Sequence, residues 1–142
     1  DRVGAFQRRV VAIQFERPAR CVRDLVPGSI PPVELVLAFA LRELDIDSIP
    51  VNFLHSRPGT ALEAAANLTP LKCLRVLSMF RFANPSKDIR AAGGRELNLR
   101  SLQPLALYVV NSIFSEGYLT TSGNPINQDH QMIRDMGFEI ED

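Results

Sequence analysis

The segment 86–96 reads SKDIRAAGGRE, a short apolar run and a glycine pair, with Arg90 inside the run and Arg95 beyond the glycines. Residues 88–92 have the length and composition of a buried strand, and Gly93 and Gly94 allow the backbone to turn sharply at its end. Proteins built as α/β barrels carry their functional residues at such strand ends. The segment therefore predicts a strand of a parallel sheet, followed by a turn that presents charged side chains.

Strand and helix patterns alternate through the last two thirds of the chain, which is typical of βα units around a parallel sheet. Thr69 and Pro70 predict an N-cap and a first helical position, and that helix should end near Asn84. Gly137 predicts the end of a last helix. The pattern as a whole predicts strands at 49–54, at 88–92 and from 113–114, and helices at 70–84, at about 101–110 and at 124–137.

The first third of the chain is less regular. Residues 3–13 are compatible with a helix, and residues 33–44, which follow Pro31 and Pro32, predict one. Residues 14–30 show neither a helical nor a strand period.

Composition narrows the classes of partner. The chain of 142 residues is 46% hydrophobic and carries 16 basic and 16 acidic residues, which is typical of a folded globular protein. Formal neutrality predicts no binding to nucleic acid or to an anionic membrane, so small molecules or proteins are the expected partners. Apolar runs fall short of the roughly 20 residues that a membrane span requires. Two cysteines 52 positions apart, Cys21 and Cys73, predict a reduced, cytoplasmic setting rather than a disulfide framework.

Four sequence motifs occur in a recognisable order. They are IRAAGGRE at 89–96, NSIF at 111–114, GYLTT at 117–121 and DHQMIRDMGFEIE at 129–141, and DSIPVNFL at 47–54 precedes them. This order resembles the C-terminal part of the biotin synthase family, the region called the biotin and thiamin synthesis associated domain. The resemblance runs from about Phe39 to Asp142. It implies that residues 39–142 are the associated domain and that residues 1–38 are a poorly matching remnant of barrel βα units. It also implies the C-terminal portion of a TIM-type (β/α) barrel, incomplete here with about three strands, because a complete barrel takes roughly 250 residues.

The resemblance also implies an activity. Members of the family are sulfurtransferases that convert dethiobiotin to biotin by radical S-adenosylmethionine chemistry, with a [4Fe-4S] cluster, a [2Fe-2S] cluster and S-adenosylmethionine, in a homodimer. Their [4Fe-4S] cluster binds to a Cys-x3-Cys-x2-Cys loop, because three thiolates leave one iron open for the cosubstrate. That loop is absent from this sequence. The chain alone is therefore expected to bind no cluster and to be inactive.

Four residues carry site assignments by resemblance. Arg90 matches the unusual arginine ligand of the [2Fe-2S] cluster, although composition alone favours a structural salt bridge. Asn52 matches an asparagine near the substrate, where a structural amide is the alternative. Thr120 and Thr121 match threonines that hydrogen-bond the carboxylate tail of dethiobiotin, although they are also good strand formers. The resemblance therefore implies that Arg90 is a metal ligand and that Asn52, Thr120 and Thr121 bind substrate.

Other candidates have mainly structural interpretations. Arg95 and Glu96 are expected to interact with each other or with neighbouring barrel groups. Cys73 has core-like spacing in a helix, where a free cysteine behaves as a small hydrophobe. Cys21 lies near the place of the family's third cluster cysteine, but its neighbours do not match. Phe114 suits the core, His130 a solvated helix face, and His55 a strand end within reach of a site.

Residues 14–37 depart from the family pattern, which has a Pro-Cys-Ser-Gly motif and a glycine-rich turn there. This departure predicts a local frameshift or replacement in the coding sequence. Two alternatives stay open. One is another radical enzyme that shares the associated domain, and the other is a non-catalytic remnant or binding module.

Overall fold

A computed structural model describes residues 10–12, 32–65, 68–117 and 123–141 of the chain. The strands are β1 (Val10–Ala12), β2 (Ser48–Val51), β3 (Asp88–Ala91) and β4 (Ser112–Phe114). The helices are α1 (Pro32–Glu43), α2 (Pro70–Ala83), α3 (Arg95–Leu99), the 3-10 turn η1 (Arg100–Leu102), α4 (Gln103–Ala106) and α5 (Ile126–Asp135). None of these helices is long and apolar enough to cross a bilayer.

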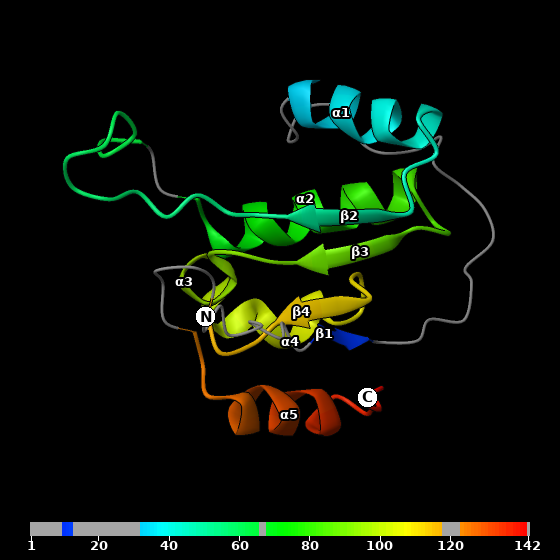
Figure 1. The fold of residues 1–142 in the computed structure, drawn as a ribbon, viewed down its shortest axis with the longest axis vertical. Coiled ribbons are helices and arrows are strands. Elements are labelled where there is room, and N and C mark those ends of the chain that lie inside the picture. The colour runs from blue at the N-terminus through cyan, green and yellow to red at the C-terminus, as the bar shows by residue number, and fades with distance from the viewer. Residues whose placement is uncertain (1–9, 13–31, 66–67, 118–122, 142) are drawn as a thin grey trace, which may run out of the picture.

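The strands form one sheet in the order β1-β4-β3-β2 (Figure 1). Strands β2, β3 and β4 are parallel, and β1 pairs with β4 in the antiparallel direction. The predicted α/β class with about three parallel strands is therefore confirmed, whereas the division of the chain at residue 38 stays a prediction. Membership of a TIM-type barrel also stays a prediction, because the described strands do not close on themselves.

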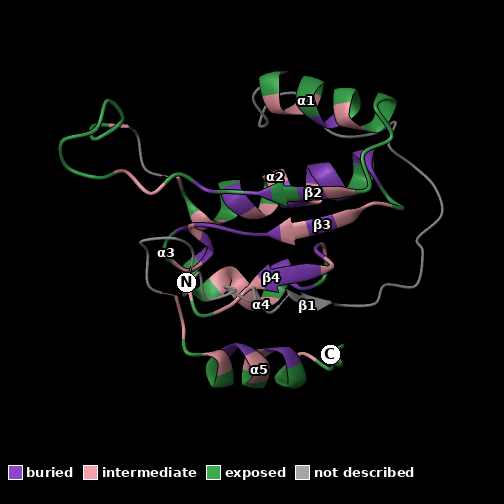
Figure 2. Ribbon diagram, in the orientation of Figure 1, coloured by how far each residue is buried: buried purple, intermediate pink, exposed green. Residues whose placement is uncertain are grey.

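Alternate residues of the parallel strands face two different environments. Ile49 and Ile89 are register partners, as are Ala91 and Ile113, and all four are buried on the face that α2 and α4 cover. In Figures 1 and 2, α2 and α4 lie behind the sheet and α3 lies beyond the carboxyl end of β3, and purple segments mark buried residues. Arg90, with its register partners Pro50 and Ser112, faces the opposite side. The fold thus separates an apolar face from a polar one.

Caps define α2 as the sequence predicts. The Thr69 hydroxyl accepts a hydrogen bond from the Lys72 amide at 3.2 Å, and Pro70 takes the first helical position. Asn84 caps the C-terminal end, and its side-chain amide donates to the Ala38 carbonyl of α1 at 3.1 Å. One residue therefore both ends α2 and fastens α1 to it. The predicted helices at 33–44 and 124–137 are also confirmed, as α1 and α5.

Two helix predictions are wrong. The segment 101–110 forms no single helix, because helical structure already begins at Arg95 and breaks into α3, η1 and α4. Pro104 stands in the first turn of α4 and lacks the N–H that a continuous helix through this point requires. Within the segment 3–13, residues Val10–Ala12 are a strand rather than a helix, and the remainder lies outside the described residues.

Strand β2 forms one edge of the described sheet. Val51 and Phe53 exchange backbone hydrogen bonds with the β3 side, at 2.9 Å from Ala92 N to Val51 O and 2.8 Å from Phe53 N to Gly93 O. The backbone groups of Ser48, Pro50 and Asn52 therefore point to the open edge. A groove of about 270 Å³ runs along it between α1 and α2.

Candidate functional site

The Gly93–Gly94 turn follows β3, and its backbone makes hydrogen bonds to the residues that follow β2. Gly93 N donates to the Asn52 side-chain oxygen at 2.9 Å, and Gly93 O accepts from Phe53 N at 2.8 Å. Gly94 has φ 75°, and a Cβ added there would lie 2.2 Å from the Phe53 carbonyl oxygen. Only glycine fits this backbone and this approach, so the sharp turn predicted from the sequence is confirmed.

One hydrogen bond fixes the orientation of the Asn52 side-chain amide. Its Oδ1 accepts from Gly93 N, which sets the plane of the side chain. Its side chain is exposed, and in the part of the chain that the structure describes Nδ2 donates to nothing. The amide therefore presents two N–H donors at the carboxyl end of β2, an arrangement suited to a carbonyl acceptor on a ligand.

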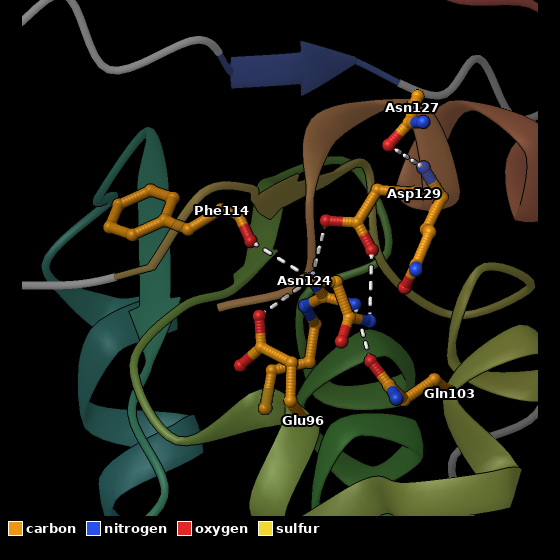
Figure 3. A network of polar contacts seen from close by, with 8 residues as sticks. Glu96, Gln103, Phe114, Asn124, Asn127 and Asp129 are labelled. Carbon is orange, nitrogen blue, oxygen red and sulfur yellow. Dashed lines mark hydrogen bonds and ion pairs between the residues drawn. The ribbon is translucent and has the colours of Figure 1, made fainter. Parts of the chain in front are cut away.

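A polar network that includes Glu96, Gln103 and Asp129 lies at the same ends of the strands (Figure 3), and buried Arg95 donates to all three. Its Nη2 lies 2.7 Å from Asp129 Oδ2 on α5, 2.8 Å from Glu96 Oε1 and 3.1 Å from the Phe114 carbonyl oxygen of β4. Its Nη1 donates to Gln103 Oε1 of α4 at 2.5 Å. One guanidinium thus connects α3, α4, β4 and α5. The predicted interaction of Arg95 with Glu96 is confirmed.

The network holds one positive and two negative charges. Arg95 is 1% exposed and Asp129 is fully buried, whereas the Glu96 side chain is 21% exposed. Burial raises the pKa of Asp129, and the Arg95 guanidinium and the Asn124 amide only partly offset that rise. Asp129 is therefore the member of the network most sensitive to the loss of its partner.

The segment that contains Thr120 and Thr121 lies outside the described residues, but both ends of it are described. Glu116 N donates to Asn124 O at 3.3 Å, and a Cβ added at Gly123 would lie 2.4 Å from Gly117 N. We call residues 116, 117, 123 and 124 the neck. The same added Cβ would lie 2.9 Å from Glu96 Oε1, so the neck rests on the Arg95 network.

Arg90 lies on the polar face of the sheet. Its Nε and Nη2 both bind Asp88 Oδ2 at 2.8 Å, and Ser48 Oγ donates to the same oxygen at 3.2 Å. The Ser112 hydroxyl is buried without a hydrogen-bond partner in the described part of the chain, and Ser112 is the register partner of Arg90. The structural salt bridge is therefore present, and an unused hydroxyl lies beside it. Sequence reasoning missed Ser48 and Ser112, although both stand in the quoted motifs.

An iron–sulfur cluster does not fit the described residues by themselves. Cys73, the described cysteine, is buried in α2 on the apolar side of the sheet, whereas Arg90 faces the polar side. Burial raises the pKa of the Cys73 thiol, which disfavours the thiolate that binds a metal. Among the described residues no three His, Cys, Asp or Glu side chains gather as a metal site requires. Cys21 lies outside the described residues.

A second buried arginine, Arg81, stabilises the opposite ends of the strands. It donates to the carbonyls of Val109 and Lys87, each at 2.9 Å, and to the side chain of Asn111. Asn111 in turn accepts from Ile89 N at 2.9 Å. This cluster lies at the amino ends of β3 and β4, where barrels carry stability rather than chemistry. Nothing in the sequence pattern singled it out.

Three further predicted residues have the following places. His55 follows β2, is half-buried, and its Nδ1 has no partner in the described chain. His130 lies on α5 and is half-buried, so the solvated face predicted for it is only partial. Phe114 is half-buried at the end of β4, and its carbonyl rather than its ring contacts the Arg95 network.

The chain is similar to a known domain family and to several known proteins. A family model described as the Biotin and Thiamin Synthesis associated domain matches residues 50–139. The chain is 61% identical to the biotin synthase of Bacillus velezensis over 105 residues, which are 74% of this chain and 31% of that protein. The biotin synthases of Halalkalibacterium halodurans (60%) and Staphylococcus aureus (59%) match over 105 residues, again 74% of this chain, and 32% and 31% of their own lengths. The chain thus spans about a third of these relatives.

Proposed function

We propose that this chain, which belongs to the family of the biotin and thiamin synthesis associated domain, is the C-terminal part of a biotin synthase. Such an enzyme converts dethiobiotin to biotin by radical S-adenosylmethionine sulfur insertion. The names of relatives about 60% identical favour this enzyme over others that carry the same domain. The activity belongs to the complete enzyme. The 142-residue polypeptide alone is inactive, because its sequence has no Cys-x3-Cys-x2-Cys loop.

One observation carries the proposal. The Asn52 amide, the Gly93–Gly94 turn and the neck are joined at the carboxyl ends of three parallel strands, where α/β proteins bind small molecules. Among the described residues the Asn52 Nδ2 donors have no acceptor, and they lie at one end of this region, with the neck at the other. Dethiobiotin has a matching polarity, with a cyclic urea at one end and a carboxylate at the other.

The proposal assigns one role to each candidate residue. Asn52 donates through Nδ2 to the urea carbonyl of dethiobiotin. Thr120 and Thr121 hydrogen-bond the carboxylate tail. Arg90 contacts the [2Fe-2S] cluster, which would supply the sulfur and whose thiolate ligands come from outside this sequence together with the [4Fe-4S] cluster and S-adenosylmethionine. The face of Arg90 suits that role, since it is polar and carries the Ser112 hydroxyl, which has no hydrogen-bond partner among the described residues.

Grafting tests the proposal in the context where activity exists. Residues 39–142 would replace the matching region of the Bacillus velezensis enzyme, and the chimera should convert dethiobiotin to biotin after cluster reconstitution. Thr120→Ala with Thr121→Ala should weaken dethiobiotin binding by about 1–3 kcal/mol, because charge-assisted hydrogen bonds to the carboxylate are lost. Arg90→Ala should change the absorption spectrum of the [2Fe-2S] cluster and leave dethiobiotin affinity unchanged.

The matched control is Asp45→Asn, which removes the negative charge from the 2.6 Å Lys87–Asp45 pair at the opposite ends of the strands. It should alter neither substrate affinity nor the spectrum. An inactive, correctly folded chimera would favour a non-catalytic remnant instead. If the threonine pair leaves affinity unchanged and Arg90→Ala leaves the spectrum unchanged, the assigned roles are wrong.

A further inference from the structure

Helix α1 is apolar on two sides, and its outer side is exposed. The inner side packs against α2, where Asn84 donates to the carbonyl of the fully buried Ala38 at 3.1 Å. The outer side carries apolar residues at helical spacing, which we call the seam: Val33, Val36, Leu37, Ala40 and, in the turn after the helix, Leu44. Val33 and Leu44, at its two ends, are each 70% exposed. A helix that is apolar on both sides is ordinarily covered on both sides, so the seam indicates a missing neighbour.

The seam continues into the groove along β2. Leu37 belongs to both, and the groove of about 270 Å³ is lined further by apolar side chains such as Leu41, Val51 and Val76. Figure 2 shows α1 beyond β2 at one side of the sheet, with much of the helix exposed. Pro50 offers no N–H at this edge, so apolar side chains rather than backbone pairing must provide most of the contact with a neighbour. The helical layer and the sheet are thus unfinished on the same side.

The first turn of α1 adds a polar feature to this surface. Glu34 lines the groove, and its Oε2 is buried without a hydrogen-bond partner in the described part of the chain. A buried carboxylate oxygen without a donor is costly, and folded proteins normally supply one. The neighbour that fills the groove should therefore combine an apolar surface with an N–H or a cationic side chain that reaches Glu34.

The topology indicates which part of a longer protein belongs on this side. Consecutive βα units of an α/β sheet lie next to each other, so the unit that precedes α1 in a longer chain is expected beside α1 and β2. At the other edge of the described sheet, β4 is already paired with β1. The aligned region is only 31% of the Bacillus velezensis enzyme, so most of such a protein remains available to cover the seam.

We propose that the seam and the groove form a docking surface for the N-terminal part of a biotin synthase, and that this part binds the chain as a separate polypeptide, without a peptide bond between them. This inference rests on the proposed function, because that function places the remainder of the protein before α1. The apolar side chains of the seam supply the contact area, and Glu34 supplies an acceptor that selects a partner with a matching donor.

Co-expression tests whether the two polypeptides assemble. The full 142-residue chain, with an affinity tag, would be co-expressed with the Bacillus velezensis biotin synthase shortened to the part that does not match it. Size-exclusion chromatography with light scattering would give the mass of the co-purified material, and dilution would give its dissociation constant. We expect a complex with one copy of each polypeptide. Its absence, or a tagged chain that associates only with itself, would overturn the proposal.

Two variants test whether the complex uses the assigned surface. Val33→Glu with Val36→Glu should weaken it on the order of tenfold or more, because two carboxylates would be buried against apolar side chains. Leu97→Glu with Leu105→Glu is the matched control, since these side chains are also exposed but lie on α3 and α4, away from the seam, and it should leave the complex unchanged.

Glu34→Leu is the second test, and it decides the matter if the double glutamate variant does not fold. It removes the oxygen that has no partner in the described chain, so the free energy of unfolding of the isolated chain should not fall, whereas the complex should weaken because the donor of the partner loses its acceptor. If the graft described above is active but no complex forms, or if the seam and Glu34 variants leave the complex unchanged, the docking surface is refuted and the proposed function stands. An inactive, folded graft together with no complex would refute both.

Discussion

Replacing Arg95 by methionine should destabilise the chain far more than the same replacement of Arg90. Arg95→Met leaves Asp129 fully buried without its cation, and removing one partner of a buried pair costs about 3–5 kcal/mol. The other acceptors add little, because Glu96 and Gln103 are partly exposed and can bind water. Arg90 and Asp88 are about one third exposed, so Arg90→Met should cost about 0–1 kcal/mol.

The cost of Arg95→Met should depend on pH, and its sign follows from the contacts of Asp129. Burial raises the pKa of this carboxyl, and Arg95 opposes the rise. Without Arg95 the pKa of Asp129 rises further, so the folded variant takes up a proton at a higher pH than the unfolded chain does. That proton stabilises the variant as the pH falls through the raised pKa. The difference in free energy of unfolding between Arg95→Met and the parent chain should therefore be smaller at about pH 5 than at about pH 7.5.

Urea unfolding followed by circular dichroism at 222 nm would measure both effects. The full 142-residue chain, Arg95→Met and Arg90→Met would be unfolded at the two pH values, and the free energies compared at equal denaturant slopes. Equal costs for the two arginines would refute the inference that the Arg95 network holds the fold at this end. A cost of Arg95→Met that does not shrink on acidification would refute the role of Asp129 as the residue left uncompensated.

Three further outcomes can be measured on the same chain. Gly94→Ala should lower the free energy of unfolding in urea by at least about 1–3 kcal/mol, because a positive φ is strained for alanine and the new Cβ would meet the Phe53 carbonyl. An unchanged free energy would contradict the turn geometry. Thr69→Ala should cost about 1 kcal/mol through the lost N-cap bond, and Thr69→Ser should restore most of it. In a Cys21→Ser background, Cys73 should resist a thiol-specific chromogenic reagent in the folded chain and react fully in urea. The reason is that Cys73 is 1% exposed and burial raises the pKa of its thiol. Fast reaction of the folded chain would disprove the burial of Cys73.

Local signals in the sequence were sufficient for the three parallel strands and for α1, α2 and α5. Each of these helices carries its own terminal signal, such as Thr69 and Pro70 for α2 or Gly137 for α5. The segment from Arg95 to Ala106 lacked such a signal. Gly94 begins α3 in a left-handed conformation with no side-chain cap, a start that a sequence pattern does not reveal.

The candidate site was predictable only where its residues adjoin in sequence. Arg95 and Glu96 are neighbours after a glycine pair, so their contact could be foreseen. Asp129 lies 34 positions away on a mostly polar helix, where an aspartate ordinarily indicates a solvated face. Its burial follows from how α5 packs, with Ile133 one turn further on inserted into the core. Tertiary packing, not local pattern, decides the partner of Arg95.

Pro50 has a consequence for how the chain behaves at high concentration. It stands in the middle of the open edge of β2, where an incoming strand would require an N–H donor that proline lacks. The edge is therefore a poor template for the stacked strands of an amyloid fibril. Association of the chain should proceed instead through apolar side chains such as Val33 and Val36 of α1, which are 70% and 67% exposed. Aggregates of this protein should accordingly be amorphous, dissolve with mild detergent and fail to enhance thioflavin T fluorescence.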